Sequence, residues 1–211
     1  MKLEGKVFNF LGDSITESWG ASAPGKAFHQ LIMKEQNLEF AYNYGVGGTR
    51  IARQRVPGRA NTKEDLTFEI RAEVMDKSAD AVVVFGGTND YGHGDAPMGD
   101  LDSEDIYTFC GGLNSLITKL QKDFPNAEII FMTPIHRVDE DKPSAPESKV
   151  LADYAEAIKA ICKKRAIKVI DLFGINPIDP YDKNLVPDGL HPNDAGHRVL
   201  ADVITEALLA L

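Results

Sequence analysis

The stretch DAVVVF, residues 80–85, runs directly into GGTND, residues 86–90. Its first part is a continuous apolar run rich in β-branched residues, which is typical of a strand covered on both faces. Residues 127–132 form a second run of the same character. Strands buried on both faces occur almost only in parallel sheets that lie between layers of helices. These two runs therefore predict an α/β protein with a central parallel sheet.

Further strands and helices alternate along the chain. Three more apolar runs complete a set of five predicted strands: residues 6–11, 39–44 and 167–171. Apolar residues recur at three- and four-residue steps between and after them, which predicts amphipathic helices over residues 103–124, 147–165 and 193–210. Acidic residues in the first turn of the 103–124 segment suit the helix dipole. This alternation implies right-handed crossovers and a sheet between two helical layers.

Length, composition and charge limit the class of protein. The chain has 211 residues, of which 43% are hydrophobic, and this suits a single globular domain over residues 1–211. A formal net charge of −9 argues against nucleic acid or an anionic membrane as partners, because both favour a basic surface. For one basic run we favour a solvated loop over an anion-binding edge: Arg50, Arg53, Arg55 and Arg59.

Three features favour a cytoplasmic protein without a membrane anchor. Glu4 stands where a signal peptide needs its apolar region, and no run approaches the roughly 20 apolar residues of a membrane span. Cys110 and Cys162 fall on apolar faces of predicted helices. We therefore expect two buried free thiols and a reducing compartment.

Polar residues that follow the predicted strands indicate where a site belongs, because ligands of open parallel sheets bind beyond the carboxyl ends of the strands. Gly12-Asp13-Ser14 follows the first strand, NYGVGGTR (43–50) the second and GGTND (86–90) the third. TPIHR (133–137) follows the fourth strand, and PDGLHPND (187–194) leads into the last helix.

Ser14 is the candidate nucleophile among these residues. A serine hydroxyl is a poor nucleophile at neutral pH unless a base lies within hydrogen-bond reach, and the base needs a partner that fixes its tautomer. His191 can be that base. Asp188, three residues earlier, can reach back to Nδ1 of the imidazole and leave Nε2 free to face Ser14.

Acyl transfer develops an oxyanion, which needs hydrogen-bond donors aimed at it in advance. The main-chain N–H groups of Ser14 and Gly48 and the side-chain amide of Asn89 are the candidates. Taken singly, each of these residues is better explained as a helix cap or a turn residue. Their joint placement at one edge of the predicted sheet favours the catalytic interpretation.

Four short blocks together resemble the SGNH (GDSL-type) hydrolase superfamily. They carry Ser, Gly, Asn and His in that order, and they span residues 12 to 194: GDSIT (12–16), GVGGTR (45–50), GGTND (86–90) and DGLHPND (188–194). The nucleophile does not lie in the G-x-S-x-G elbow of α/β-hydrolases, because Thr16 stands where the second glycine would be. The resemblance is therefore to a separate serine-hydrolase architecture.

The resemblance implies a fold and a set of roles. The fold is a flavodoxin-like three-layer α/β/α sandwich with a five-stranded parallel sheet in the order 2-1-3-4-5. Ser14 matches the nucleophile, Asp188 and His191 the acid and base, and Ser14, Gly48 and Asn89 the oxyanion hole. The family hydrolyses esters and thioesters without a metal or other cofactor.

The expected function is that of a serine esterase acting on small acyl esters, with acetyl esters of carbohydrates as the leading candidates. An acyl-thioesterase or lysophospholipase of the same fold is the alternative within hydrolases. A non-catalytic carbohydrate- or nucleotide-binding domain is the alternative from another class. A homo-oligomer is compatible with the sequence.

Four further residues are candidates for lining the substrate pocket: Asp13, Trp19, Tyr91 and His136. Each has an ordinary structural explanation beside the functional one. Asp13 is better placed to cap a helix than to act as a base, and core or rim packing is the default for Trp19 and Tyr91. For His136 we weigh a place beside the leaving group equally with a packing role.

Overall fold

The computed structural model describes residues 1–54, 66–146 and 148–211. Its centre is a five-stranded sheet in the order β2-β1-β3-β4-β5, and all neighbouring strands are parallel. Strands β1 to β5 run over Val7–Gly12, Phe40–Gly45, Ala81–Phe85, Glu128–Met132 and Lys168–Ile170. The structure therefore confirms the predicted flavodoxin-like sandwich and its strand order.

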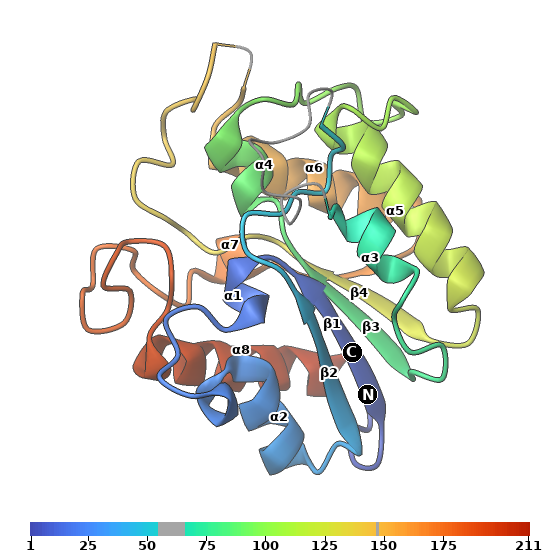
Figure 1. Ribbon diagram of the computed structural model, residues 1–211, viewed down its shortest axis with the longest axis vertical. Helices are drawn as coiled ribbons and strands as arrows, with labels where there is room; N and C mark the ends of the chain where they lie inside the picture. Colours follow the sequence, from blue (N-terminus) through green and yellow to red (C-terminus); the bar gives the residue numbers. More distant parts are fainter. Residues whose placement is uncertain (55–65, 147) are drawn as a thin grey trace.

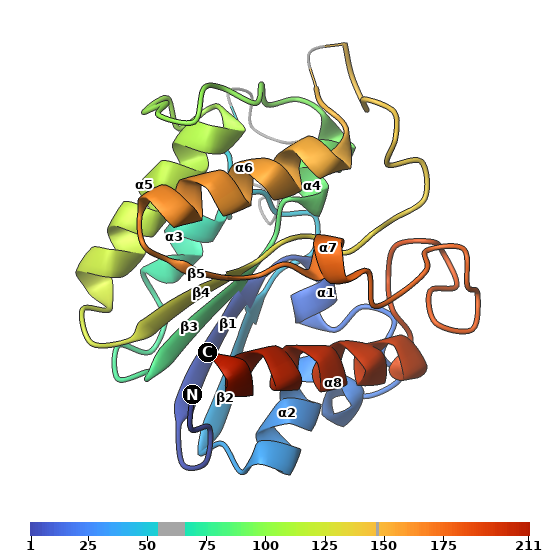
Figure 2. The ribbon, with the colours of Figure 1, turned by 180° about the vertical axis from the view of Figure 1, so that it is seen from behind.

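Helices cover both faces of this sheet. Helices α3, α5 and α6 pack on one face, and α2 and α8 pack on the other (Figure 1; Figure 2 shows the same layers from behind). The described helices are α1 (Ser14–Glu17), α2 (Phe28–Gln36), α3 (Phe68–Ala72), α4 (Thr88–His93), α5 (Phe109–Asp123), α6 (Leu151–Lys164), α7 (Leu172–Ile175) and α8 (Asp194–Ala210), with a short 3₁₀ turn over Pro24–Lys26.

The residues of β3 show why its sequence is apolar throughout. Val82 and Val84 belong to the core between the sheet and α5 and α6, whereas Val83 and Phe85 belong to the core on the side of α2 and α8. All four side chains are buried. Every side chain of β3 lies in one of these two apolar layers, so polar groups follow only where this strand ends.

Two of the predicted helices start later than expected. The predicted 103–124 helix begins at Phe109, because the Thr108 side chain caps it by accepting the Gly111 N–H, and the acidic residues before it lie outside its first turn. The predicted 147–165 helix begins at Leu151. Residue 147 lies outside the described residues.

The expectation of a solvated arginine loop is wrong for Arg50. This residue is 2% exposed, and its guanidinium pairs with Asp95. Arg53 is partly exposed and pairs with Glu69 at 3.2 Å. The other two arginines of the run, Arg55 and Arg59, belong to residues 55–65, which lie outside the described residues.

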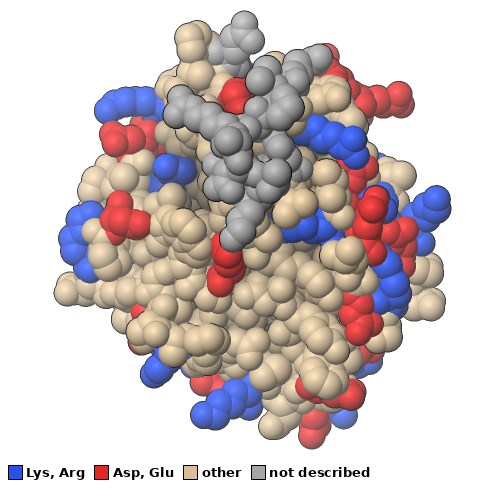
Figure 3. Space-filling model, viewed as in Figure 1, with Lys and Arg blue, Asp and Glu red and all other residues tan. Residues whose placement is uncertain are grey.

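Charged residues of both signs are mixed on the face that Figure 3 shows. Figure 3 shows Lys and Arg side chains interspersed with Asp and Glu on the described part of this face, without one continuous basic area. No helix among the described residues has both the length and the apolar character needed to cross a membrane. Cys110 and Cys162 are buried free thiols, as expected.

The end of β2 packs directly on the backbone of α1, and this contact can be tested at Gly45. A Cβ atom on Gly45 would lie 2.1 Å from the Glu17 nitrogen, so the two main chains would have to separate. We expect Gly45→Ala to lower the free energy of unfolding by about 1–3 kcal/mol in urea denaturation, as overpacking typically does. Gly25→Ala is the control, because nothing lies within 4 Å of a Cβ there. Equal stability of the two variants would contradict this packing.

Candidate active site

Ser14 lies at the start of α1, immediately beyond the carboxyl end of β1. Asp13 caps this helix, because its Oδ1 accepts the N–H of Ile15 at 3.0 Å. The cap is therefore Asp13 and not Ser14. The Ser14 side chain is free for another partner, and its Oγ lies 2.8 Å from Nε2 of His191, which is 177 residues away in sequence.

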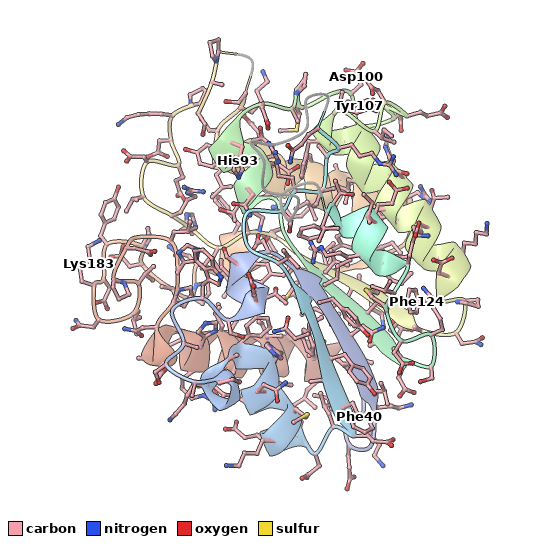
Figure 4. The ribbon with its side chains drawn as sticks, in the orientation of Figure 1. Phe40, His93, Asp100, Tyr107, Phe124 and Lys183 are labelled. Carbon is pink, nitrogen blue, oxygen red and sulfur yellow. The ribbon has the colours of Figure 1, made fainter. Side chains whose placement is uncertain are left out.

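The loop between α7 and α8, residues 176–193, supplies the other two members of this group. Oδ2 of Asp188 lies 2.6 Å from Nδ1 of His191. Oδ1 of Asp188 accepts the main-chain N–H groups of Leu190 at 2.9 Å and His191 at 2.7 Å. The loop thus fixes the carboxylate, and the carboxylate fixes the ring. Figure 4 shows how far this loop extends, with Lys183 at its outer bend.

The charge state of Asp188 suits this arrangement. Partial burial acts to raise the pKa of Asp188, but the hydrogen bonds from His191 and Leu190 outweigh it and hold the pKa below its ordinary value. Asp188 is therefore ionised at neutral pH and can only accept hydrogen bonds. Nδ1 of His191 then carries the ring proton, and Nε2 presents a lone pair to the Ser14 hydroxyl.

A tight turn after β2 presents Gly48. Thr49 closes the turn, since its N–H and its hydroxyl both donate to the Val46 carbonyl, at 3.4 and 2.6 Å. Gly48 has φ of +77°, a conformation that glycine adopts without steric penalty. Neither the Gly48 N–H nor the Ser14 N–H donates to another described residue. Both are thus available to a ligand.

Asn89 on α4 and Glu17 on α1 each form a hydrogen bond with the turn that carries Gly48. The Asn89 amide donates to the Thr49 carbonyl at 3.0 Å and retains a second N–H. Glu17, one helical turn beyond Ser14, accepts the Gly47 N–H at 2.5 Å. The three donors expected from the sequence therefore lie on elements that meet at this turn, while their convergence on an oxyanion stays a prediction.

Trp19 is an expected lining residue whose side chain lies against the His191 ring. Its ring is 5.3 Å from the His191 ring, centroid to centroid, and its indole N–H donates to Glu17 at 3.1 Å. The residue is 54% exposed. Trp19, Asp188 and His191 border a cavity of about 200 Å³.

Tyr91 and His136 have structural contacts instead of a place in that cavity. The buried Tyr91 hydroxyl lies 2.6 Å from the Asp139 carbonyl oxygen. Nδ1 of His136 lies 2.5 Å from Glu140, and its Nε2 lies 3.0 Å from the Phe173 carbonyl oxygen. Both ring nitrogens of His136 are therefore engaged, and both residues brace the segment after β4. His93, which Figure 4 places at the end of α4, is exposed.

Two buried charged residues near the site were not anticipated. Asp90 accepts the N–H groups of Ile51 and Ala52 at 3.1 and 2.9 Å, and burial raises its pKa to about 6. Arg71 on α3 is 6% exposed, and burial lowers its pKa to about 10, so it stays protonated at neutral pH. In the sequence, the pair Asn89-Asp90 indicated only a turn or a helix cap, so the burial of Asp90 was not expected. Nothing in the sequence around Arg71 indicated burial.

Comparison with known proteins fits this geometry. The sequence model of the GDSL-like lipase/acylhydrolase family matches residues 10–199. The chain belongs to this family. It is therefore a hydrolase that acts on esters, and the match includes all four blocks quoted from the sequence.

Solved structures share the fold of this GDSL-like hydrolase. A Lactobacillus plantarum protein is 28% identical with a TM-score of 0.83, over 99% of this chain and 98% of that chain. An acetyl xylan esterase is 23% identical with a TM-score of 0.66, over 95% and 98%. The M. smegmatis aryl esterase is 16% identical with a TM-score of 0.73, over 98% and 99%. At their identities, the two esterases show a common fold alone. The comparison with curated proteins gives no match.

The buried carboxyl of Asp13 makes a prediction about pH. Burial raises its pKa from 3.8 to about 7, despite the Ile15 N–H and the Arg71 charge. Below pH 3.8 the group is protonated in the folded and the unfolded chain. Between that pH and about 7 only the unfolded chain ionises, so the folded state loses stability as the pH rises.

Asp13→Asn keeps the oxygen that accepts the Ile15 N–H but cannot titrate. We expect the free energy of unfolding of this variant, relative to that of the natural chain, to increase from about pH 4 to about pH 7 and then to level off. Urea denaturation at a series of pH values measures this difference. A difference that does not depend on pH would show that Asp13 ionises normally in the folded chain.

Proposed function

We propose that this chain is a serine esterase that cleaves small acyl esters, with acetyl esters of carbohydrates as the leading substrates. The 2.8 Å contact between Oγ of Ser14 and Nε2 of His191 carries the proposal, together with Asp188 on the far side of the ring. Family membership supports it, because the chain is a hydrolase acting on esters.

The first half of the reaction forms an acyl-enzyme. Oγ of Ser14 attacks the ester carbonyl carbon while Nε2 of His191 takes the hydroxyl proton. The carbonyl electron pair moves to oxygen, and the resulting oxyanion accepts hydrogen bonds from the N–H groups of Ser14 and Gly48 and from the amide of Asn89. When the tetrahedral intermediate collapses, the C–O bond to the alcohol breaks and His191 gives its proton to the leaving oxygen.

The second half regenerates the enzyme. A water molecule attacks the acyl-serine carbonyl and gives a proton to His191. When the second tetrahedral intermediate collapses, the bond between the acyl carbon and Oγ of Ser14 breaks, His191 gives its proton to Oγ, and the carboxylic acid leaves. Asp188 stabilises the imidazolium in both halves without taking its proton. Each oxyanion donor typically contributes about 10²–10³ in rate.

The preference for a carbohydrate ester rests on the surroundings of His191. Trp19, Asp188 and His191 border a cavity of about 200 Å³, which lies beside the base and is not lined by Ser14. The exposed Trp19 ring offers a flat apolar surface to a sugar ring. A protein with the same fold is an acetyl xylan esterase, and this supports a carbohydrate ester as the substrate. An acyl-thioesterase or lysophospholipase is the alternative.

The nucleophile and the acyl preference can be tested together. We expect the natural chain to hydrolyse p-nitrophenyl acetate faster than esters of longer acids and to release acetate from acetylated sugars. Ser14→Ala should reduce these rates to background, and a fluorophosphonate probe should label only the natural chain, because the reacting oxygen is gone. Thermal unfolding serves as the control for folding. Full activity of Ser14→Ala would place the nucleophile elsewhere, and a preference for long acyl chains or thioesters would favour the alternative.

Trp19 tests the carbohydrate preference. We expect Trp19→Ala to lower kcat/KM for an acetylated saccharide by about 3- to 10-fold more than for ethyl acetate, because only the saccharide loses a stacking surface. Trp19→Phe is the matched control, since it keeps an aromatic ring. The ratio of the two kcat/KM values separates recognition of the sugar from any effect on His191. An unchanged ratio would remove Trp19 from sugar binding.

A further inference from the structure

The guanidinium of Arg71 connects two segments that bear on the proposed oxyanion hole. Its Nη1 donates to the Gly12 carbonyl at 2.8 Å, and its Nη2 donates to Oγ1 of Thr49 at 2.7 Å. Nη1 also donates to the Tyr44 carbonyl, and Nε donates to the Leu66 carbonyl at 3.0 Å. All four acceptors are neutral oxygens. Among the described residues, the charged group therefore makes directed hydrogen bonds and no direct ion pair.

The Thr49 hydroxyl links Arg71 to the turn that carries Gly48. The Thr49 hydroxyl accepts from Arg71 and donates to the Val46 carbonyl at 2.6 Å, so it is held from both sides. Its bond to Val46 closes the turn in which Gly48 adopts positive φ. The direction of the Gly48 N–H therefore depends on where the Thr49 hydroxyl is held.

The Gly12 carbonyl links Arg71 to the segment that carries Ser14. The Gly12 carbonyl lies two residues before Ser14, at the point where β1 ends. A guanidinium is planar and rigid, so the spacing of its nitrogens does not change. One rigid group thus holds the segment that carries the Ser14 N–H and the segment that carries the Gly48 N–H.

We propose that Arg71 is a positioning residue of the oxyanion hole, which sets the spacing of the Ser14 and Gly48 N–H groups through Gly12 and Thr49. This inference rests on the proposed function. It adds a residue that touches neither the substrate nor Ser14 Oγ. Oxyanion donors act only when they lie about 2.7–3.1 Å from the developing charge, so a shift of either segment lowers the rate of the chemical step.

Thr49→Val and Thr49→Ser form the matched pair that tests this role. Valine keeps the size of threonine and removes the hydroxyl that joins Arg71 to the turn, whereas serine keeps the hydroxyl. We expect Thr49→Val to lower kcat for p-nitrophenyl acetate by about 10- to 100-fold with KM within about twofold, because the interaction matters in the transition state. Thr49→Ser should stay within about threefold of the natural chain. Fluorophosphonate titration gives kcat per active site and removes the effect of unfolded protein.

The outcomes separate this inference from the proposed function. A natural chain that neither hydrolyses esters nor labels at Ser14 overturns the proposed function, and the inference with it. A natural chain that does both, beside a Thr49→Val variant with an unchanged kcat per titrated site, overturns the positioning role alone. A change in KM without a change in kcat also overturns it. Should Thr49→Val not fold, Arg71→Lys replaces it, because lysine keeps the positive charge but lacks the planar guanidinium that donates to several acceptors at once. An unchanged kcat of Arg71→Lys would likewise overturn the positioning role.

Discussion

Burial of both faces of the parallel sheet is the constraint on which the rest of the molecule depends. Helices cover β1 and β3 on both sides, so the residues of these strands are apolar except for Asn9, which is buried and donates to the Asp76 carbonyl; the other polar groups appear where the chain leaves the sheet. All five strands run in one direction, so these exits lie at one edge. Ser14, the Gly48 turn and Asn89 follow three adjacent strands and meet there for that reason.

The ionisable residues beneath this edge form hydrogen bonds chiefly with the main chain. Asp13 accepts the Ile15 N–H, Asp90 accepts two N–H groups of the 51–52 segment, and Arg71 donates to carbonyl and hydroxyl oxygens. Burying a charge is costly unless hydrogen bonds satisfy it. In this molecule those bonds shape the loops that follow β1 and β2. The site is thus built on a layer of buried polar residues between it and the apolar core.

The sequence predicted the fold, and it placed the candidate site residues at one edge of the sheet, because both inferences follow from local patterns. Continuous apolar runs such as 81–85 identify covered strands, and Ser14 and Asn89 could be placed by the strands that they follow. His191 and Asp188 could be paired because they are three positions apart in a turn-forming segment.

Other features depend on contacts that no local pattern records. A charged residue is exposed by default, so the burial of Arg50 and Arg71 could not be anticipated without their distant partners. The late start of α5 follows from the Thr108 cap, which competes with a good amphipathic pattern. His136 has the residue type and position of a site residue, but Glu140 and Phe173 occupy its two ring nitrogens.

The separation of 177 residues between Ser14 and His191 has a consequence for synthesis. The amino-terminal strand and its serine leave the ribosome long before the histidine has been translated. Until the 176–193 loop closes over that serine, its hydroxyl is an ordinary alcohol with no base beside it. A chain that lacks this loop, or in which the loop has not docked, therefore has no activated serine.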